Sequence, residues 1–156
     1  MSAADLAGWE KLSCLFFSRA CRRVLGRYLE SNGFSERSVD RIGIVTFSRF
    51  GIFLEIGYEL EMAPNYMPTV VLGIGEGKYD KKGQPSAIPF WYLIPSDRPE
   101  SKYSLWTFKT EAELETALAR IKDEVLEVHA KPLWSNLEKL EKVISNFRAE
   151  FSGIAT

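Results

Sequence analysis

The sequence predicts a domain of the α+β class: an antiparallel meander sheet of about five strands, with an N-terminal helix and two C-terminal helices packed on it. Apolar residues repeat at helical spacing near both ends of the chain, whereas the middle alternates between apolar and polar residues. Short turns separate the predicted strands, which favours antiparallel pairing because parallel strands need long crossover connections. The 156 residues fit the size of a single domain, residues 1–156, with no dividing linker.

The clearest element is a β-hairpin over Ile42–Met62 that turns at Arg49–Gly51. In its second strand, the even-numbered positions from Ile52 onward are apolar, and the odd-numbered positions include three glutamates. A strand with this alternation buries one face and shows the other to water or to a partner. We therefore expect Phe53 and the glutamates to lie on an open face.

The residues before this hairpin predict a long amphipathic helix, Ala4–Ser31, with an apolar stripe from Trp9 to Tyr28. Gly33 is expected to end it, because glycine readily adopts the left-handed conformation that follows a helix C-terminus. Ser35–Arg41 is predicted to be a polar link into the hairpin.

Three further strands are predicted after the hairpin: Thr69–Ile74, Ala87–Ile94 and Tyr103–Lys109. A proline-bounded loop, Ala63–Pro68, precedes the first, and a polar glycine-rich turn, Gly75–Pro85, follows it. Prolines at both ends of the segment 87–94 suit an edge strand, because proline cannot donate a ladder hydrogen bond.

Two amphipathic helices complete the chain, and a capping box opens each of them, Thr110–Glu113 and Ser135–Glu138. In the first, apolar residues from Leu114 to Val128 repeat at alternating spacings of four and three, so we expect them all to be buried. Pro132 is expected to stop this helix.

Composition and charge narrow the classes of partner. Hydrophobic residues make up 46% of the chain and the formal net charge is −1, so no global field favours nucleic acid or an anionic membrane. No apolar run approaches the roughly 20 residues of a membrane span, and no secretory signal pattern is present. We expect a cytoplasmic protein with reduced cysteines, since Cys14 and Cys21 lie too far apart on one helix for a disulfide. Four arginines are interpreted as a solvated helix face with local ion pairs: Arg19, Arg22, Arg23 and Arg27.

Candidate catalytic and metal-binding groups are few, so we expect no catalytic residue, no metal and no cofactor. The single histidine, His129, has no nucleophile or carboxylate constellation near it in sequence and suits a helix C-terminus. Gly73–Lys78 lacks the spacing of a phosphate-binding loop, so a hairpin loop is favoured. Glu59 and Glu61 would lie about 7 Å apart, as in inverting glycosidases, but a solvent-facing acidic strand has the same spacing.

Aromatic residues, at 13% of the chain, supply the candidate functional surface. If the helices cover only the apolar sheet face, the aromatic side chains opposite lie exposed among charges, as in many interaction surfaces. The alternative is a sheet buried on both sides, with the N-terminal helix crossing the second face. The candidate binding residues are Arg49, Phe53, Glu55, Glu59, Tyr66, Tyr79 and Trp91.

The leading functional hypothesis is a non-catalytic, protein-binding domain, of the kind that a bacterial accessory or toxin-neutralising protein would provide. The alternative is a small-molecule-binding protein or enzyme with a pocket between sheet and helices. Such a pocket would use Tyr58, Trp91 or Trp106, with Glu59 or Arg49 as polar group, and an enzyme would hold a carboxyl group of raised pKa there. A homodimer through the edge segment 87–94 is a third hypothesis.

Overall fold

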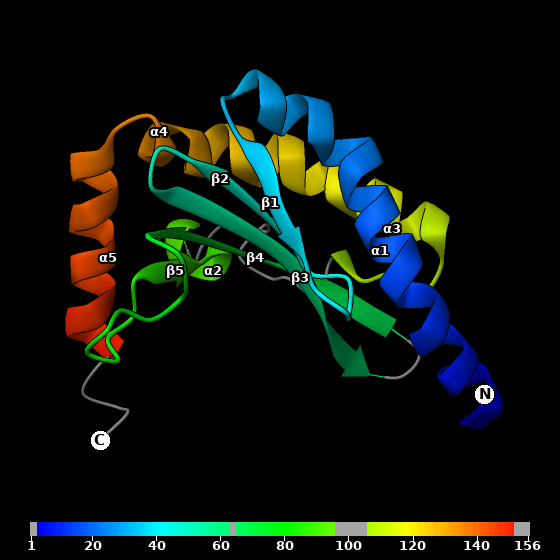
Figure 1. Ribbon diagram of the computed structural model, residues 1–156. Coiled ribbons are helices and arrows are strands. Elements are labelled where there is room, and N and C mark those ends of the chain that lie inside the picture. The colour runs from blue at the N-terminus through cyan, green and yellow to red at the C-terminus, as the bar shows by residue number, and fades with distance from the viewer. Residues whose placement is uncertain (1–2, 63–64, 96–105, 152–156) are drawn as a thin grey trace.

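A five-stranded antiparallel sheet in the order β1-β2-β3-β4-β5 forms the centre of the molecule (Figure 1). The computed structural model describes residues 3–62, 65–95 and 106–151, with side chains from residue 16 onward except those of 60–62. The strands are β1 (Ser35–Val39), β2 (Val45–Arg49), β3 (Ile52–Met62), β4 (Asn65–Ile74) and β5 (Ala87–Pro89). The helices within these ranges are α1 (Ala3–Ser31), α2 (Phe90–Leu93), α3 (Glu111–Ile121), the π-helical segment η3 (Lys122–Ala130), α4 (Lys131–Trp134) and α5 (Leu137–Phe151). The predicted α+β meander is confirmed.

Helices α1 and α3 lie side by side on the apolar face of the sheet (Figure 1). Ile52, Leu54 and Ile56 of β3 are buried in this layer. The ring of Phe17 from α1 lies 4.7 Å from that of Tyr58, measured between centroids. Helix α1 therefore packs on the same face as α3 and does not cross the second face.

The hairpin between β2 and β3 turns within the predicted segment Arg49–Gly51, but Arg49 is the last residue of β2, so the turn has two residues. Phe50 and Gly51 form this turn with φ values of 44° and 80°, the left-handed pair that matches the natural twist of two antiparallel strands. Gly33 likewise has a positive φ of 86°. The amide of Phe34 donates back to the Leu29 carbonyl at 2.9 Å, which ends α1 at the predicted place.

Two segments that were predicted to be irregular are strands. The predicted link Ser35–Arg41 contains β1, an exposed edge strand that pairs with β2 and has a bulge between Glu36 and Ser38. The predicted loop Ala63–Pro68 largely belongs to β4, which begins at Asn65; residues 63–64 lie outside the described residues. Pro68 is tolerated because β5 pairs only with positions 71–73, so its missing donor costs no ladder bond on that side.

The predicted strand Ala87–Ile94 is wrong beyond Pro89. Pro89 ends the ladder and Phe90, which is fully buried, starts the short helix α2. The edge that the homodimer hypothesis uses is therefore three residues long, with α5 beside it. Of the predicted strand Tyr103–Lys109, residues 103–105 lie outside the described residues, and Phe108 forms an isolated bridge with Tyr66.

The helix after Thr110 begins as predicted but does not stop at Pro132. Glu113 donates its amide to Thr110 Oγ1 at 3.2 Å, which confirms the cap. From Lys122 the helix widens into η3, and the wider turns carry Val128 outward, to 55% exposure, instead of into the core. Pro132 comes directly after this π-helical segment, in the first turn of α4. The backbone N–H that proline lacks is not needed for a helix hydrogen bond at that position.

The cap of α5 lies one residue later than predicted. Oδ1 of Asn136, not a group of Ser135, accepts the amide of Lys139 at 3.3 Å. Asparagine and serine cap helices about equally well, so the sequence alone does not distinguish these neighbours.

Two further expectations concern side chains on α1. Cys21 is a buried free thiol whose pKa is raised by burial, and the side chain of Cys14 lies outside the described residues. Arg22 pairs with Glu36 at 2.7 Å, and Arg23 pairs with Glu111 at 2.9 Å, which is the local pairing expected of this arginine-rich face. None of the helices in the described ranges has the length and apolar character needed to cross a membrane.

Candidate functional site

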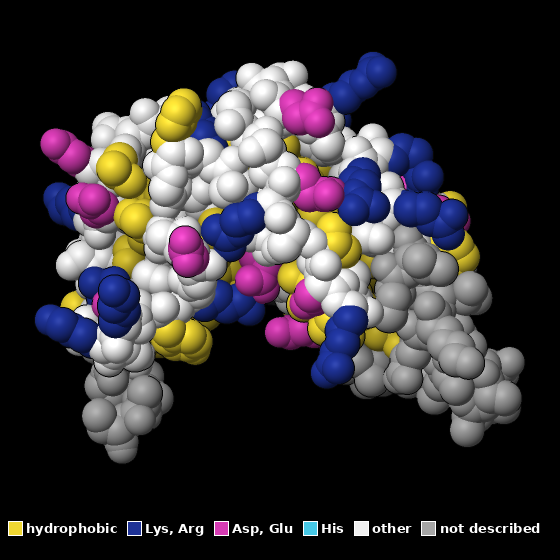
Figure 2. Space-filling model, viewed as in Figure 1, with side chains coloured by type: hydrophobic (Ala, Val, Ile, Leu, Met, Phe, Trp, Pro, Cys, Tyr) yellow, Lys and Arg dark blue, Asp and Glu magenta, His cyan; other side chains and the backbone are white. Residues whose placement is uncertain are grey.

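No helix of the described residues covers the centre of the sheet face opposite α1 and α3 (Figure 1). Helices α2 and α5 border this face beside β5. Figure 2 shows the surface hollowed below the sheet, with acidic and basic side chains at the margin of the hollow. This face carries the odd-numbered residues of β3 and β4, where the alternation along β4 leaves every second side chain half-buried. The sequence left open whether this face is covered, and among the described residues no helix crosses its centre.

Two adjoining depressions on this face form one groove. The first has a volume of about 220 Å³ and is lined by Glu59, Met67, Thr69, Val70, Val71, Lys78, Pro89 and Trp91. The second has a volume of about 150 Å³ and is lined by Val71, Lys78, Tyr79, Pro85, Ala87, Pro89 and Phe147. Because they share Val71, Lys78 and Pro89, the depressions are continuous, and we call them together the sheet groove.

Strand register builds the floor of the sheet groove. Val71 pairs with Pro89 across β4 and β5, and Met67 pairs with Glu59 across β4 and β3. Residues directly opposite each other on neighbouring strands have adjacent side chains on one face. The floor therefore combines apolar side chains with two carboxylates, Glu59 at one end and Glu55 opposite Val71.

A rigid loop, residues 75–86, forms one wall and positions Lys78 and Tyr79. Oδ1 of Asp80 accepts the amides of Lys82 and Gln84 at 2.8 and 2.9 Å, and Tyr79 forms a β-bridge with Pro85. These backbone hydrogen bonds, that from Gln84 first, lower the pKa of the Asp80 carboxyl group. The glycine-rich turn is thus a structured hairpin loop that presents a lysine and a tyrosine at the groove.

Helix α5 forms the end wall and is tied to the same loop. The Arg148 guanidinium pairs with the Asp80 carboxylate at 3.4 Å and donates from Nε to the Pro85 carbonyl. Its neighbour Phe147 packs against Tyr92 with ring centroids 5.0 Å apart. Consecutive residues of α5 therefore fix the loop and line the groove.

Trp91 is the aromatic side chain on the remaining side. Its ring packs edge-on against Phe151, with centroids 5.6 Å apart, and against Phe147 at 6.2 Å. The indole nevertheless remains 44% exposed. A ring that is held in position and still solvated is a suitable contact for a partner.

Of the charged side chains that the structure describes at the sheet groove, two form an ion pair and one does not. Lys78 Nζ lies 2.9 Å from Glu55 Oε1, in an ion pair whose carboxylate is the less exposed partner. Glu59 is exposed, and within the described residues no basic side chain pairs with it. Among the described residues, two carboxylates and one ammonium lie at the groove, so one negative charge has no described basic partner.

Four of the seven candidate residues lie at or beside this groove: Glu55, Glu59, Tyr79 and Trp91. The expectation that Phe53 lies open is wrong, because it is 1% exposed. Its cross-strand partner is Gly73, and a Cβ there would lie 2.6 Å from the ring, so the ring occupies the space that glycine leaves. The Arg37 guanidinium lies over the same ring, 5.8 Å from its centroid.

Tyr66 and Arg49 also lie elsewhere. Tyr66 is in β4 rather than a loop, is 4% exposed and stacks on Phe108 at 5.9 Å on the helix side of the sheet. Arg49 ends β2 and lies 5.9 Å from the ring centroid of Phe50 at the hairpin tip. Sequence reasoning missed further lining residues of the groove: Met67, Thr69, Val71, Lys78, Pro89 and Phe147. The alternation at positions 67, 69 and 71 is a signal for the first three, and the proline at position 68 concealed it.

Comparisons of this chain with protein-family models, curated proteins and solved structures find no match. A function for the sheet groove is therefore argued from its own geometry and chemistry.

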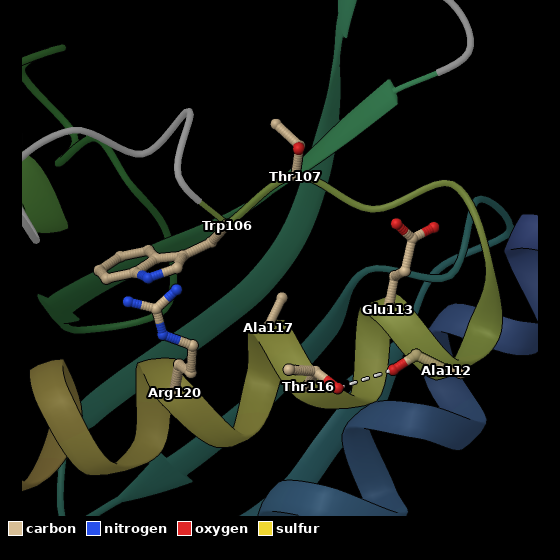
Figure 3. Close-up of a pocket in the computed structure, with 7 residues that line it drawn as sticks. All are labelled: Trp106, Thr107, Ala112, Glu113, Thr116, Ala117 and Arg120. Carbon is tan, nitrogen blue, oxygen red and sulfur yellow. Dashed lines mark hydrogen bonds between the residues drawn. The ribbon is translucent and has the colours of Figure 1, made fainter.

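A larger depression of about 340 Å³ lies between α3 and the chain that precedes it, lined by Trp106, Thr107, Ala112, Glu113, Thr116, Ala117 and Arg120 (Figure 3). Its polar groups already serve the protein. Arg120 lies 5.9 Å from the Trp106 ring centroid and pairs with Glu124, and Glu113 accepts the Lys109 amide at 3.3 Å. Thr116 donates to the Ala112 carbonyl at 3.1 Å.

The residues named for a pocket between sheet and helices are divided among several places, and one of the named pairs, Glu59 with Trp91, shares the sheet groove. Trp106 lies in the α3 depression, and Tyr58 donates its hydroxyl to the Ile42 carbonyl, whereas Glu59 and Trp91 share the sheet groove. Within the described ranges, no group of three or more His, Cys, Asp or Glu side chains is arranged to hold a metal ion.

Proposed function

We propose that this protein is a non-catalytic binding protein that holds an extended segment of a partner protein in the sheet groove. The observation that supports this function is the half-exposed Trp91, held in position at a groove on the sheet face that no helix of the described residues crosses. Tryptophan is the residue type most enriched at the energetic centres of protein interfaces, and a preformed position avoids an ordering cost on binding.

The shape of the groove favours a chain over a compact small molecule. The groove consists of two shallow depressions of about 220 and 150 Å³ in a row instead of one deep, enclosed pocket. Two small depressions in a row suit successive side chains of an extended peptide. A peptide whose side chains fill both would bury Val71 and Pro89 between them.

The alternative, an enzyme, would be supported by an acid or base of displaced pKa in the pocket. The carboxyl groups whose pKa is displaced have lowered values and are structural partners. A hydrogen bond from Arg22 lowers the pKa of Glu36, and one from Tyr28 lowers that of Glu127. Asp80, the third such carboxyl group among the described residues, holds loop 75–86 together and pairs with Arg148, so its role is structural as well.

A role as a bacterial accessory or toxin-neutralising protein in the cytoplasm is part of this proposal. A binding protein can inhibit its partner simply by occupying a functional surface, which needs no catalytic group. The free, buried thiol of Cys21 is in keeping with a reducing compartment.

The experiment is selection of a phage-displayed library of random peptides on the wild-type protein, followed by affinity measurement on variants. We expect selected peptides to bind at least about tenfold more weakly to Trp91→Ala. Phe50→Ala is the matched control, since it removes an aromatic side chain that is 91% exposed at the hairpin tip. Its affinity should equal that of the wild type.

A second variant separates loss of binding from loss of folding. Thr69 lines the first depression, and Ile44 already packs over its cross-strand partner Gly57, so the ring of Thr69→Phe occupies the groove rather than the space over the glycine. We expect a native amide NMR spectrum and loss of peptide binding. Selected peptides that bind Thr69→Phe as well as wild type, or a selection that yields none, would contradict the proposed function.

A further inference from the structure

We propose that the partner segment presents a basic side chain, preferably arginine, two residues from an aliphatic one. The arginine enters the depression between Glu59 and Trp91, and the aliphatic side chain enters the depression beside Phe147. This inference rests on the proposed function, and it specifies the chemistry of the ligand that the same groove recognises.

The charges around the first depression determine which kind of peptide side chain it favours. The Lys78 ammonium is already offset by Glu55 at 2.9 Å, whereas the Glu59 carboxylate has no basic partner in the described part of the chain. A cationic side chain therefore gains an attraction in this depression that an anionic one lacks. An acidic side chain would face the uncompensated carboxylate.

The surface around Glu59 favours arginine among the cations. Met67, Thr69 and Pro89 give an apolar floor on which the aliphatic part of the side chain can lie. Trp91, which is 44% exposed, lines the same depression. A guanidinium group can stack on an indole and pair with a carboxylate at once, because it is planar.

The second depression is lined differently. Apart from Lys78 and the Tyr79 hydroxyl, its walls are apolar: Val71, Pro85, Ala87, Pro89 and Phe147. A leucine-sized side chain can fill it without leaving a polar group unpaired. Phe147 closes its far end from α5.

The spacing of the two positions follows from strand geometry. The depressions adjoin at Val71, Lys78 and Pro89. Side chains at positions i and i+2 of an extended peptide point the same way and lie about 7 Å apart. Neighbouring depressions on one face therefore accept alternate residues, Arg-x-Leu or Leu-x-Arg according to the direction of the bound chain.

The experiment uses two fluorescein-labelled peptides, Gly-Ser-Arg-Thr-Leu-Ser-Gly and Gly-Ser-Leu-Thr-Arg-Ser-Gly, with versions that carry glutamine or glutamate in place of arginine. Fluorescence anisotropy gives affinities, and amide NMR titration to about 1 mM peptide maps the contacts. We expect one arginine peptide to shift the amides of β4 and of loop 75–86, and to bind about tenfold more tightly than its glutamine version.

Variants then assign the preference to Glu59. Glu59→Gln should weaken binding of the arginine peptide by about five- to twentyfold and leave the glutamine peptide unchanged. Glu59→Lys should reverse the preference toward the glutamate peptide. Glu30→Gln, an exposed carboxylate on α1, is the control and should change neither affinity.

The outcomes separate this inference from the function on which it rests. If library-selected peptides bind the groove but Glu59→Gln changes no affinity, or if neither arginine peptide shifts a groove amide, the arginine preference is wrong and peptide binding stands. If Thr69→Phe fails to block the selected peptides, the groove itself is not the binding site. If the Glu59→Gln variant still binds the arginine peptide more tightly than the glutamine peptide, the assignment of this preference to Glu59 is wrong.

Discussion

Phe50 combines two unusual properties for an aromatic residue. It has a φ of 44°, in the left-handed region, and its side chain is 91% exposed at the tip of the β2–β3 hairpin. Side chains other than glycine, asparagine and aspartate lose about 1 kcal/mol or more in this conformation. The hairpin therefore forms in spite of the residue at its first turn position.

Replacing this residue should stabilise the protein. Asn-Gly is the preferred pair for a two-residue hairpin turn of this shape, so Phe50→Asn should raise the free energy of unfolding by about 0.5–1 kcal/mol. Urea denaturation measures this change. Phe50→Leu keeps the strain and should give no gain, and a loss of stability in Phe50→Asn would show that the ring contributes more than its exposure indicates.

Gly73 is required by the ring that lies over it. A Cβ at this position would lie 2.6 Å from Phe53 Cε1 and from the Ala87 Cβ, which is closer than carbon atoms approach one another. We expect Gly73→Ala to lower the free energy of unfolding by about 1–3 kcal/mol, measured by chemical denaturation. Gly77→Ala, with nothing within 4 Å of the added carbon, is the control and should change stability by no more than about 0.5 kcal/mol.

The same pair explains why sequence reasoning placed Phe53 on the correct face and misjudged its exposure. Alternation along β3 assigns the face from local sequence. Burial of the ring depends on Gly73 in β4 and on Arg37 in β1. These residues are distant in sequence, and the strand that carries Arg37 was predicted to be a link.

At the scale of an element, the cap of α5 offers a direct comparison between neighbouring residues. Asn136→Ala removes the acceptor of the Lys139 amide and should lower stability by about 1 kcal/mol. Ser135→Ala should have little effect, because the hydroxyl is not the capping group. Thermal unfolding of both variants tests this, and a larger loss in Ser135→Ala would restore the cap predicted from sequence.

Loop 75–86 should show a defined pH dependence. Hydrogen bonds from Gln84 and Lys82 lower the folded-state pKa of Asp80 below its ordinary value of about 3.9, so the stabilisation they provide is present above that value. It is lost as the pH falls through the folded-state pKa. We expect wild type to melt at a higher temperature than Asp80→Asn at neutral pH, with the difference closing at acid pH. A difference that persists at the lowest pH would contradict this assignment.

In the helix that contains η3, the π-helical turns change which of the regularly spaced apolar residues face the core. Spacings of four and three place Val128 with Leu114 and Leu118 on a regular helix. The wider turns of η3 instead bury Leu126 and Ala130, and Val128 faces solvent. Nothing in the local apolar pattern signals this change, because π-helical pairing depends on how the whole helix packs.

At the scale of the whole molecule, the sequence alone predicted the fold class, the meander topology and the apolar sheet face on which the helices pack. It was insufficient for β1, whose Ser-Glu-Arg-Ser-Val sequence has no apolar alternation and which forms by pairing with β2. It was also insufficient for the groove. Trp91 comes from α2, Phe147 from α5 and Lys78 from a loop, and only the assembled fold brings these three together.

The tie between Arg148 and Asp80 makes two walls of the groove move as one body. Phe147 and Arg148 are consecutive, so any rotation of α5 that withdraws the ring also pulls on the loop that carries Lys78 and Tyr79. The width of the sheet groove and the position of α5 are thus coupled. An occupant that wedges between them holds the C-terminal helix against the sheet, so slower amide exchange along that helix would report occupancy from outside the contact itself.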